Sequence, residues 1–268
     1  MYCQKFLNSN NMEKLSTNEL DKIFDTEIYP ELIFGKGGSD VKEAAVIGGQ
    51  PGSGKSSVVR ILLEQNENFV FINGDDFREY LPMYKDLMKT DPDNAADFSQ
   101  YAVNYWVEKS IDKCIEENLS IIVEGTMRVP ETSLKTANKL KSAGYTITFL
   151  LVSTPYELSL ESIRIRYEEA IKMYGVGRST KVESHDQAFI GIKKTILVLF
   201  NSKIASCFVV INRNKDSELE LSEFSPECEA EILEKFNKNR GDIPTQNNEI
   251  IDEIGKIQEG QNISGNKC

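Results

Sequence analysis

The stretch IGGQPGSGKSS, residues 47–57, combines glycine, lysine and serine at a spacing that could bind phosphate. Gly49 opens the pattern G-x-x-x-x-G-K-[ST], and Gly54, Lys55 and Ser56 close it. Glycines let several backbone N–H groups approach one anion. Lys55 supplies a cation for the β- and γ-phosphates, and Ser56 supplies a hydroxyl for Mg²⁺. The sequence therefore predicts a site for ATP or a related triphosphate with Mg²⁺.

The residues around this loop support the prediction. An apolar, strand-like run precedes the loop, and the apolar spacing of a helix follows it. A glycine-rich turn with a chance lysine, which is the alternative, would not need this context. The residues expected to contact the nucleotide are Gly49, Gln50, Pro51, Gly52, Ser53, Gly54, Lys55, Ser56 and Ser57.

Charged residues follow the next two strand-like runs. Asp75 and Asp76 come directly after one run, and Glu124, Thr126 and Arg128 come after the other. Because ligands gather at the carboxyl ends of strands in open parallel sheets, these side chains should lie near the phosphate loop. Carboxylates after a strand are also common in turns, so position alone does not fix the function of Asp75.

Two arginines flank a glycine-bearing segment further along the chain. Arg166 lies in a helix-like stretch and Arg178 in the following loop, which suggests a lid that brings two guanidinium groups to the phosphates. Pairing with Glu168 and Glu169 on the surface is the alternative. The base-reading motif N-K-x-D of GTP-binding switches is absent, because the segment starting at Asn214 fails at its last position.

The rest of the core alternates between strand-like and helix-like segments, which is typical of a parallel sheet with helices on both faces. The five expected strands are residues 44–48, 69–73, 120–123, 146–152 and 208–211. The expected helices of the core are residues 55–65, 98–117, 130–143, 155–173 and 186–202. The predicted fold class is α/β, a P-loop kinase-like parallel sheet of about five strands.

Three segments are expected. Residues 1–42 form an N-terminal helical segment, residues 43–212 the P-loop kinase core, and residues 213–268 an acidic C-terminal appendage that is partly helical or disordered. Ser16 with Glu19 predicts the start of the N-terminal helix. The appendage is expected to hold a helix at about residues 225–237, a shorter helix around residues 250–257, and a disordered end.

The composition excludes several classes of protein. The chain has 42 acidic and 31 basic side chains, a net charge of −11 that argues against general nucleic-acid binding. Its five cysteines are odd in number and lack C-x-x-C spacing, which argues against a disulfide framework or zinc. The absence of an apolar signal core or membrane-length segment leads us to expect a cytoplasmic protein without membrane contact.

These motifs together resemble the zeta toxins of bacterial epsilon/zeta toxin–antitoxin systems. The likeness covers about residues 14–212 and rests on GGQPGSGKSS, INGDDFR, IIVEGTMR and RYEEAIKMYGVGRSTKVESHD. The resemblance implies a kinase that phosphorylates the sugar 3′-hydroxyl of UDP-N-acetylglucosamine with ATP, and an antitoxin protein as partner. This sequence departs from the pattern of the family between Met83 and Gln100 and after Ile211.

The resemblance also implies roles for individual residues. Asp75 matches the catalytic base of the family, and Arg166 and Arg178 match its two lid arginines. Glu124 would contact either the substrate or a metal-bound water. The residues that match contacts to the sugar nucleotide are Asn104, Glu108, Glu124, Thr126, Arg128 and Thr136.

Two other functions stay open at this point. A kinase of similar fold could act on another small molecule, such as an antibiotic or a nucleoside. A binding module without catalysis could use the P-loop to report ATP to a partner. His185, the single histidine, is expected to be structural or incidental.

Overall fold

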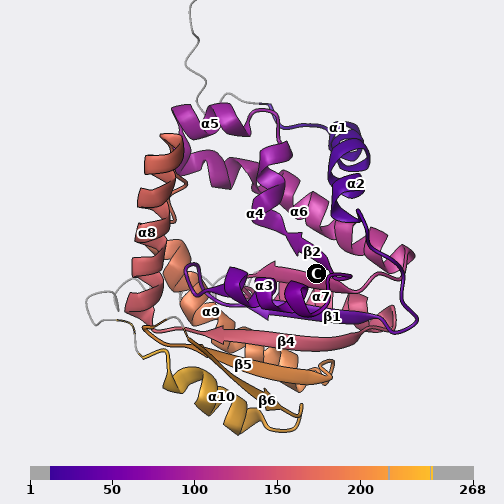
Figure 1. Cartoon of the computed structure of the whole chain (residues 1–268), viewed down its shortest axis with the longest axis vertical. Coiled ribbons are helices and arrows are strands. Elements are labelled where there is room, and N and C mark those ends of the chain that lie inside the picture. The colour runs from indigo at the N-terminus through magenta and orange to yellow at the C-terminus, as the bar shows by residue number, and fades with distance from the viewer. Residues whose placement is uncertain (1–12, 217, 242, 244–268) are drawn as a thin grey trace, which may run out of the picture.

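A computed structural model gives the fold of residues 13–216, 218–241 and 243. In this part of the chain, six strands form one sheet in the order β2-β3-β1-β4-β5-β6 (Figure 1). All neighbouring strands are parallel except β5 and β6, which are antiparallel. The strands are β1 (Glu43–Gly48), β2 (Val70–Asn73), β3 (Ile121–Gly125), β4 (Thr146–Ser153), β5 (Cys207–Arg213) and β6 (Leu219–Phe224).

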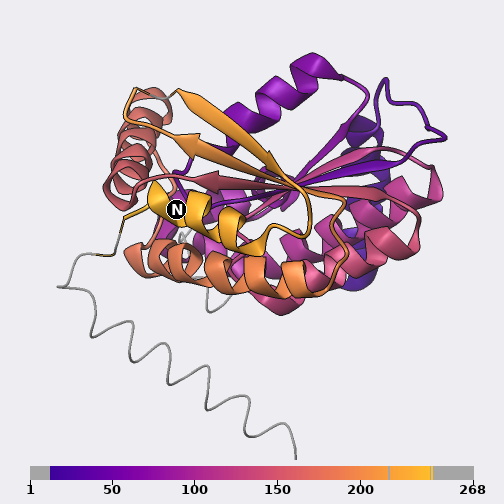
Figure 2. The same ribbon diagram turned by 90° about the horizontal axis from the view of Figure 1, so that it is seen from below.

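Helices cover both faces of the sheet, as predicted. On one face, α3 packs its valines and leucines against the strands, and α7, α9 and α10 lie along the other face (Figure 2). The helices in the described residues are α1 (Thr17–Ile23), η2 (Phe24–Ile28), α2 (Tyr29–Leu32), α3 (Lys55–Gln65), α4 (Gly74–Phe77), η3 (Arg78–Tyr80), α5 (Tyr84–Thr90), α6 (Pro92–Glu116), α7 (Pro130–Ser142), α8 (Tyr156–Tyr174), α9 (Val182–Asn201) and α10 (Glu229–Lys238).

Alternation along the central strands explains the two layers. In β1, Ala44 and Val46 belong to the larger core, whereas Ala45 and Ile47 belong to the core under α3. Successive side chains of a strand point to opposite faces, so a strand buried on both sides must be apolar throughout. This is why the five predicted strands were visible as continuous apolar runs.

The N-terminal helix begins where the sequence predicts. The side chain of Ser16 accepts a hydrogen bond from the backbone of Glu19, whose carboxylate accepts one from the Ser16 backbone. The helix packs on α6, where the indole of Trp106 donates to the carbonyl oxygen of Leu20 at 3.0 Å. Phe24 is fully buried. The helical segment thus belongs to the larger core.

The sixth strand was not predicted from the sequence. Its residues, LELSEF, mix acidic or polar with apolar side chains, and β6 pairs with β5 at the edge of the sheet. The short elements α4, η3 and α5 were not predicted either. The helix expected around residues 250–257 and the disordered end lie outside the described residues.

The segment after β6 also packs against the sheet. Ile232 and Phe236 of α10 are buried in the larger core, and the Ser153 hydroxyl donates to the carbonyl oxygen of Phe236 at 2.6 Å. Arg240, 1% exposed, places its guanidinium over the rings of Phe189 and Phe236 at 3.8 and 4.6 Å. Such cation–π contacts partly compensate the burial of its charge.

Within the described residues, none of the helices is long and apolar enough to cross a membrane.

Candidate active site

The phosphate loop connects β1 to α3 and has the backbone geometry that the sequence predicts. Gly52 and Gly54 have positive φ angles of 75° and 98°, a region that favours glycine. A Cβ on Gly52 would lie 2.1 Å from the carbonyl oxygen of Ser159, and one on Gly54 would lie 3.0 Å from Cδ of Arg213. The loop therefore lies between α8 and the end of β5. A side chain at Gly52 would collide with the backbone of α8, and one at Gly54 would be strained by the positive φ.

Lys55 lies at the start of α3 with its side chain 10% exposed. Its Nζ donates to the carbonyl oxygens of Gly49 at 3.0 Å and Gln50 at 3.2 Å, and lies 4.0 Å from Oε1 of Glu124. Burial lowers the pKa of Lys55, and the charge of Glu124 partly offsets this effect. The ammonium group is thus held inside the loop where the phosphates would bind.

Asp75 lies directly after β2, at the start of α4, and two arginines hold its carboxylate. Arg178 contacts both oxygens at 2.6 Å, and Nε of Arg78 donates to Oδ1 at 3.1 Å. Although burial opposes the effect, these guanidinium groups hold the pKa of Asp75 well below its usual range. Asp75 is therefore a carboxylate throughout the neutral range.

Arg78 was not among the predicted site residues. Its side chain is 7% exposed and donates to the carbonyl oxygen of Ala96, the hydroxyl of Ser99 and the amide oxygen of Gln100 at 2.5 to 2.8 Å. It thereby ties Asp75 to α6. The spacing of three residues from Asp75 on a helical turn was the signal in the sequence.

Asp76 faces a different environment from its neighbour. Its side chain lines a cavity with Glu31, Tyr80 and Phe77, on the side of the N-terminal helices. Burial raises the pKa of Asp76. The pKa values of the two adjacent carboxylates are therefore shifted in opposite directions.

Glu124 lies near the end of β3, next to Lys55. Its side chain is 13% exposed, and Oε2 is buried without a hydrogen-bond partner. Burial raises the pKa of Glu124, while the charge of Lys55 opposes the shift. An unsatisfied buried carboxylate oxygen in a site indicates a missing donor, such as a ligand hydroxyl or a water bound to a metal.

The two predicted lid arginines lie at the same end of the sheet. Arg166 of α8 donates to the hydroxyl of Thr180 at 3.3 Å, and Arg178 binds Asp75. Burial and the neighbouring charge of Arg178 lower the pKa of Arg166. The arginine that forms surface ion pairs in α8 is Arg164, which binds Glu161 and Glu168.

Besides Glu124 of β3, the residues matched to the sugar nucleotide lie on α6, on the loop after β3 and on α7. Asn104 and Glu108 are one turn apart on α6, and Glu108 pairs with Lys135 at 3.0 Å and Lys139 at 3.4 Å. A Cβ on Gly74 would lie 2.7 Å from the neighbouring Val103 side chain, so this part of α6 packs directly against the start of α4. The structure thus brings α6 next to Asp75.

Thr126 and Arg128 lie in the loop after β3, and Thr136 lies on α7. Packing fixes this loop, because a Cβ on Gly191 of α9 would lie 2.1 Å from the carbonyl oxygen of Arg128. Met127 adopts a positive φ of 50°, which is uncommon for a residue with a side chain. The loop is held in one shape by α9.

Arg213 is a second residue that sequence analysis missed. From the end of β5, its Nη1 donates to the carbonyl oxygen of Gly52 at 2.9 Å and to the hydroxyl of Ser162 at 3.1 Å. Burial lowers the pKa of Arg213. Arg213 thus supports the phosphate loop from the end of β5. Its position at the carboxyl end of a parallel strand was the available signal.

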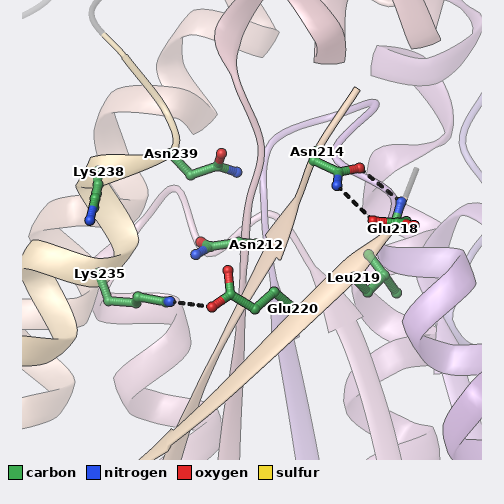
Figure 3. Close-up of a pocket in the computed structure, with 8 residues that line it drawn as sticks. All are labelled: Asn212, Asn214, Glu218, Leu219, Glu220, Lys235, Lys238 and Asn239. Carbon is green, nitrogen blue, oxygen red and sulfur yellow. Dashed lines mark hydrogen bonds and ion pairs between the residues drawn. The ribbon is translucent and has the colours of Figure 1, made fainter. Parts of the chain in front are cut away.

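A polar cavity of about 570 Å³ lies elsewhere, between β5, β6 and α10 (Figure 3). Lys235 binds Glu220 across it at 2.7 Å, and Asn214 donates to Glu218 at 3.2 Å. None of the predicted site residues lines this cavity. The candidate active site therefore remains at the phosphate loop.

The parallel strand order, the loop after β1 and the charged residues beyond β2 and β3 define a P-loop protein of the kinase type. The sequence model of the zeta toxin family matches residues 38–222. The chain belongs to this family, as the motifs predicted.

Two relatives show the extent of the likeness. Toxin PezT of Streptococcus pneumoniae serotype 4 (strain ATCC BAA-334 / TIGR4) is 34% identical over 157 residues, which are 58% of this chain and 62% of that protein. The match thus spans less than two thirds of the length of PezT. Toxin zeta of Streptococcus pyogenes is 28% identical over 230 residues, 81% of this chain and 78% of that protein.

Solved structures share the fold. A structure from the PezAT chromosomal toxin–antitoxin system of Streptococcus pneumoniae superposes with a TM-score of 0.72 at 22% identity, covering 93% of this chain and 98% of that chain. The AvrRxo1-ORF1:-ORF2 complex with ATP gives a TM-score of 0.54 at 16% identity, covering 89% of this chain and 76% of that chain.

Proposed function

We propose that the protein is the toxin of a bacterial toxin–antitoxin system and transfers the γ-phosphoryl group of ATP to the sugar 3′-hydroxyl of UDP-N-acetylglucosamine. The observation that carries the proposal is the convergence of Lys55, Asp75, Glu124 and Arg178 at the carboxyl end of the sheet. Membership of the zeta toxin family supports the reaction type. Consumption of a cell-wall precursor would arrest growth.

In this proposal the phosphate loop binds ATP. Backbone N–H groups of residues 52–57, the Lys55 ammonium and the dipole of α3 hold the β- and γ-phosphates. The described residues contain no cluster of three acidic, histidine or cysteine side chains that would hold a metal. Mg²⁺ keeps several waters and binds phosphates with few protein ligands. Ser56 would ligate the ion, and the unpartnered Oε2 of Glu124 would accept from one of its waters or from the acceptor substrate.

Asp75 is the proposed general base. It would accept the proton of the sugar hydroxyl as the new P–O bond forms. Arg178 and Arg166 would stabilise the charge on the transferring group. Arg178 binds Asp75, so an incoming γ-phosphate would compete for this guanidinium and release the carboxylate for catalysis.

The sugar nucleotide would bind beside this centre. Asn104 and Glu108 of α6, Thr126 and Arg128 of the loop after β3, and Thr136 of α7 would provide its contacts. Lys135 and Lys139 hold the Glu108 carboxylate and limit its rotation.

The partner would be an antitoxin protein, which is the type of assembly named for the PezAT structure. The cytoplasm, where nucleotide sugars are made and used, is the proposed location.

The test is transfer of label from ATP to a panel of UDP-sugars, with Lys55→Ala as the control. Product with UDP-N-acetylglucosamine and none from the control is expected. Label on another small molecule would indicate a different kinase, and ATP binding without acceptor-dependent ADP release would indicate a binding module. In cells without antitoxin, wild-type protein should arrest growth and Lys55→Ala should not; equal toxicity would contradict the kinase explanation.

A further inference from the structure

A buried chain of hydrogen bonds connects the phosphate loop to the helices that flank the loop of residues 175–181, here called the α8–α9 loop. We infer that His185 is a positioning residue, which acts through Ser159 and Gln50 to fix the phosphate loop relative to the α8–α9 loop. The catalytic consequence rests on the proposed function, whereas the structural consequence does not.

The chain of hydrogen bonds begins at the side chain of Gln50, a residue of the phosphate loop. Gln50 Nε2 donates to the carbonyl oxygen of Thr154 at 2.9 Å and to Oγ of Ser159 at 3.3 Å. Oγ of Ser159 lies 2.8 Å from Nε2 of His185, whose Nδ1 lies 3.0 Å from Oδ1 of Asp186. Gln50, Ser159 and His185 are fully buried, and Asp186 is 3% exposed.

One arrangement of protons satisfies this chain with a neutral ring. The carboxylate of Asp186 accepts the Nδ1 proton of His185 and also the hydroxyl proton of Tyr156, at 2.9 Å. Nε2 then carries a lone pair and accepts from the Ser159 hydroxyl, for which the carbonyl oxygen of Tyr156 at 2.8 Å is the competing acceptor. The Ser159 oxygen accepts from Gln50. A protonated ring would donate at both nitrogens, but burial lowers the pKa of His185 despite the opposing charge of Asp186.

Serine, histidine and aspartate in this order also occur in hydrolases. Here, however, the Ser159 hydroxyl is fully buried behind the phosphate loop, where a substrate cannot reach it. The chain of hydrogen bonds therefore has a positioning role within the protein and does not act on a substrate.

The positions of these residues explain what the chain fixes. Ser159 lies near the start of α8, about two turns before Arg166, and His185 lies near the start of α9, seven residues after Arg178. The segment between Ser159 and His185 carries both arginines. The chain of hydrogen bonds thus attaches both ends of this segment to the phosphate loop. On the other side of the chain, the carbonyl oxygen of Gln50 holds Lys55. A shift of Gln50 would move the lysine and the arginines relative to each other.

Ser159→Ala is the sharpest test, because it breaks the chain with little change in volume. Ser110→Ala is its matched control: Ser110 is also fully buried in a helix and bonds to a carbonyl of its own helix, Trp106, at 2.7 Å. We expect amide hydrogen exchange in residues 49–57 of the nucleotide-free protein to be about tenfold faster in Ser159→Ala than in Ser110→Ala. Equal exchange in the two variants would overturn the proposal.

Two substitutions of His185 separate positioning from simple packing. His185→Gln retains an acceptor near Ser159, whereas His185→Asn retains only a donor near Asp186. Protection of residues 49–57 and affinity for ATP should persist in His185→Gln and fall about tenfold in His185→Asn. Loss in both, or in neither, would contradict a role transmitted through Ser159. The exchange measurement needs no substrate, so it stands even if UDP-N-acetylglucosamine is not the acceptor.

Discussion

Asp75→Asn should separate nucleotide binding from phosphoryl transfer. The asparagine has a similar shape but cannot accept the hydroxyl proton, a loss typically of about 10²- to 10⁴-fold in rate. The substitution also weakens the contact with Arg178. The side chain of Arg178 is 24% exposed and that of Asp75 is 48% exposed. A pair this exposed contributes about 1 kcal/mol or less.

That energy sets the expected effect on binding. If ATP must take Arg178 from Asp75, then Asp75→Asn should bind ATP as well as the wild-type protein, or up to about fivefold more tightly. Binding can be measured by calorimetry with a non-hydrolysable ATP analogue, and transfer by ADP release in the presence of UDP-N-acetylglucosamine.

Asp76→Asn is the control, because Asp76 faces the N-terminal helices and should be dispensable for transfer. Wild-type turnover in Asp75→Asn, or an inactive Asp76→Asn, would refute the base assignment. Weaker ATP binding in Asp75→Asn would refute the competition for Arg178.

Three further outcomes are expected. Arg178→Ala should lower kcat more than it raises the KM for ATP, since its contact strengthens as charge moves in the transition state; a pure KM effect in steady-state assays would assign it to ground-state binding. Phe236→Ala should lower the free energy of unfolding in urea by about 3–5 kcal/mol, because the ring is fully buried, and a negligible change would show that α10 is dispensable. Because the pKa of His185 is lowered in the fold, the unfolded chain binds more protons, so stability should rise with pH up to about 6.5 and then level off. Asp186, Arg240 and Glu157 are the charged groups that act on the ring. His185→Gln should flatten this part of the curve, and an unchanged slope would point to another group.

The sequence was informative where structure is local. Continuous apolar runs identified the five parallel strands, because strands buried on both faces have few polar residues. The glycine loop was recognisable because its phosphate chemistry requires particular residues at fixed spacing. The carboxyl ends of neighbouring parallel strands share one edge, so the proximity of Asp75 and Glu124 to Lys55 followed from the strand pattern.

Strand β6 shows the limit of this approach. Its mixture of polar and apolar residues is compatible with an edge strand, but its acidic side chains resemble those of a solvated tail. Only pairing with β5 distinguishes the two. The division at residue 212 stays a prediction, although β6 and α10 pack against the core strands.

Long-range contacts were beyond sequence analysis. Arg178 and Asp75 are 103 residues apart, and no local pattern predicts their pairing. The same holds for Glu108, which pairs with lysines of α7. The partners of His185 were equally invisible, because a single histidine beside an aspartate has no distinctive spacing. These contacts depend on how the helices pack.

The contact between Tyr156 and Arg240 has a consequence for protein synthesis. Tyr156 lies three residues before Ser159, which binds Gln50 of the phosphate loop. The backbone N–H of Tyr156 donates to the carbonyl oxygen of Arg240 at 3.2 Å. A chain made from its N-terminus produces the phosphate loop well before Arg240. Until Arg240 has been made, the nascent chain therefore lacks part of the support for this loop. The order of synthesis thus delays completion of the candidate active site until after β6 and α10 have been made.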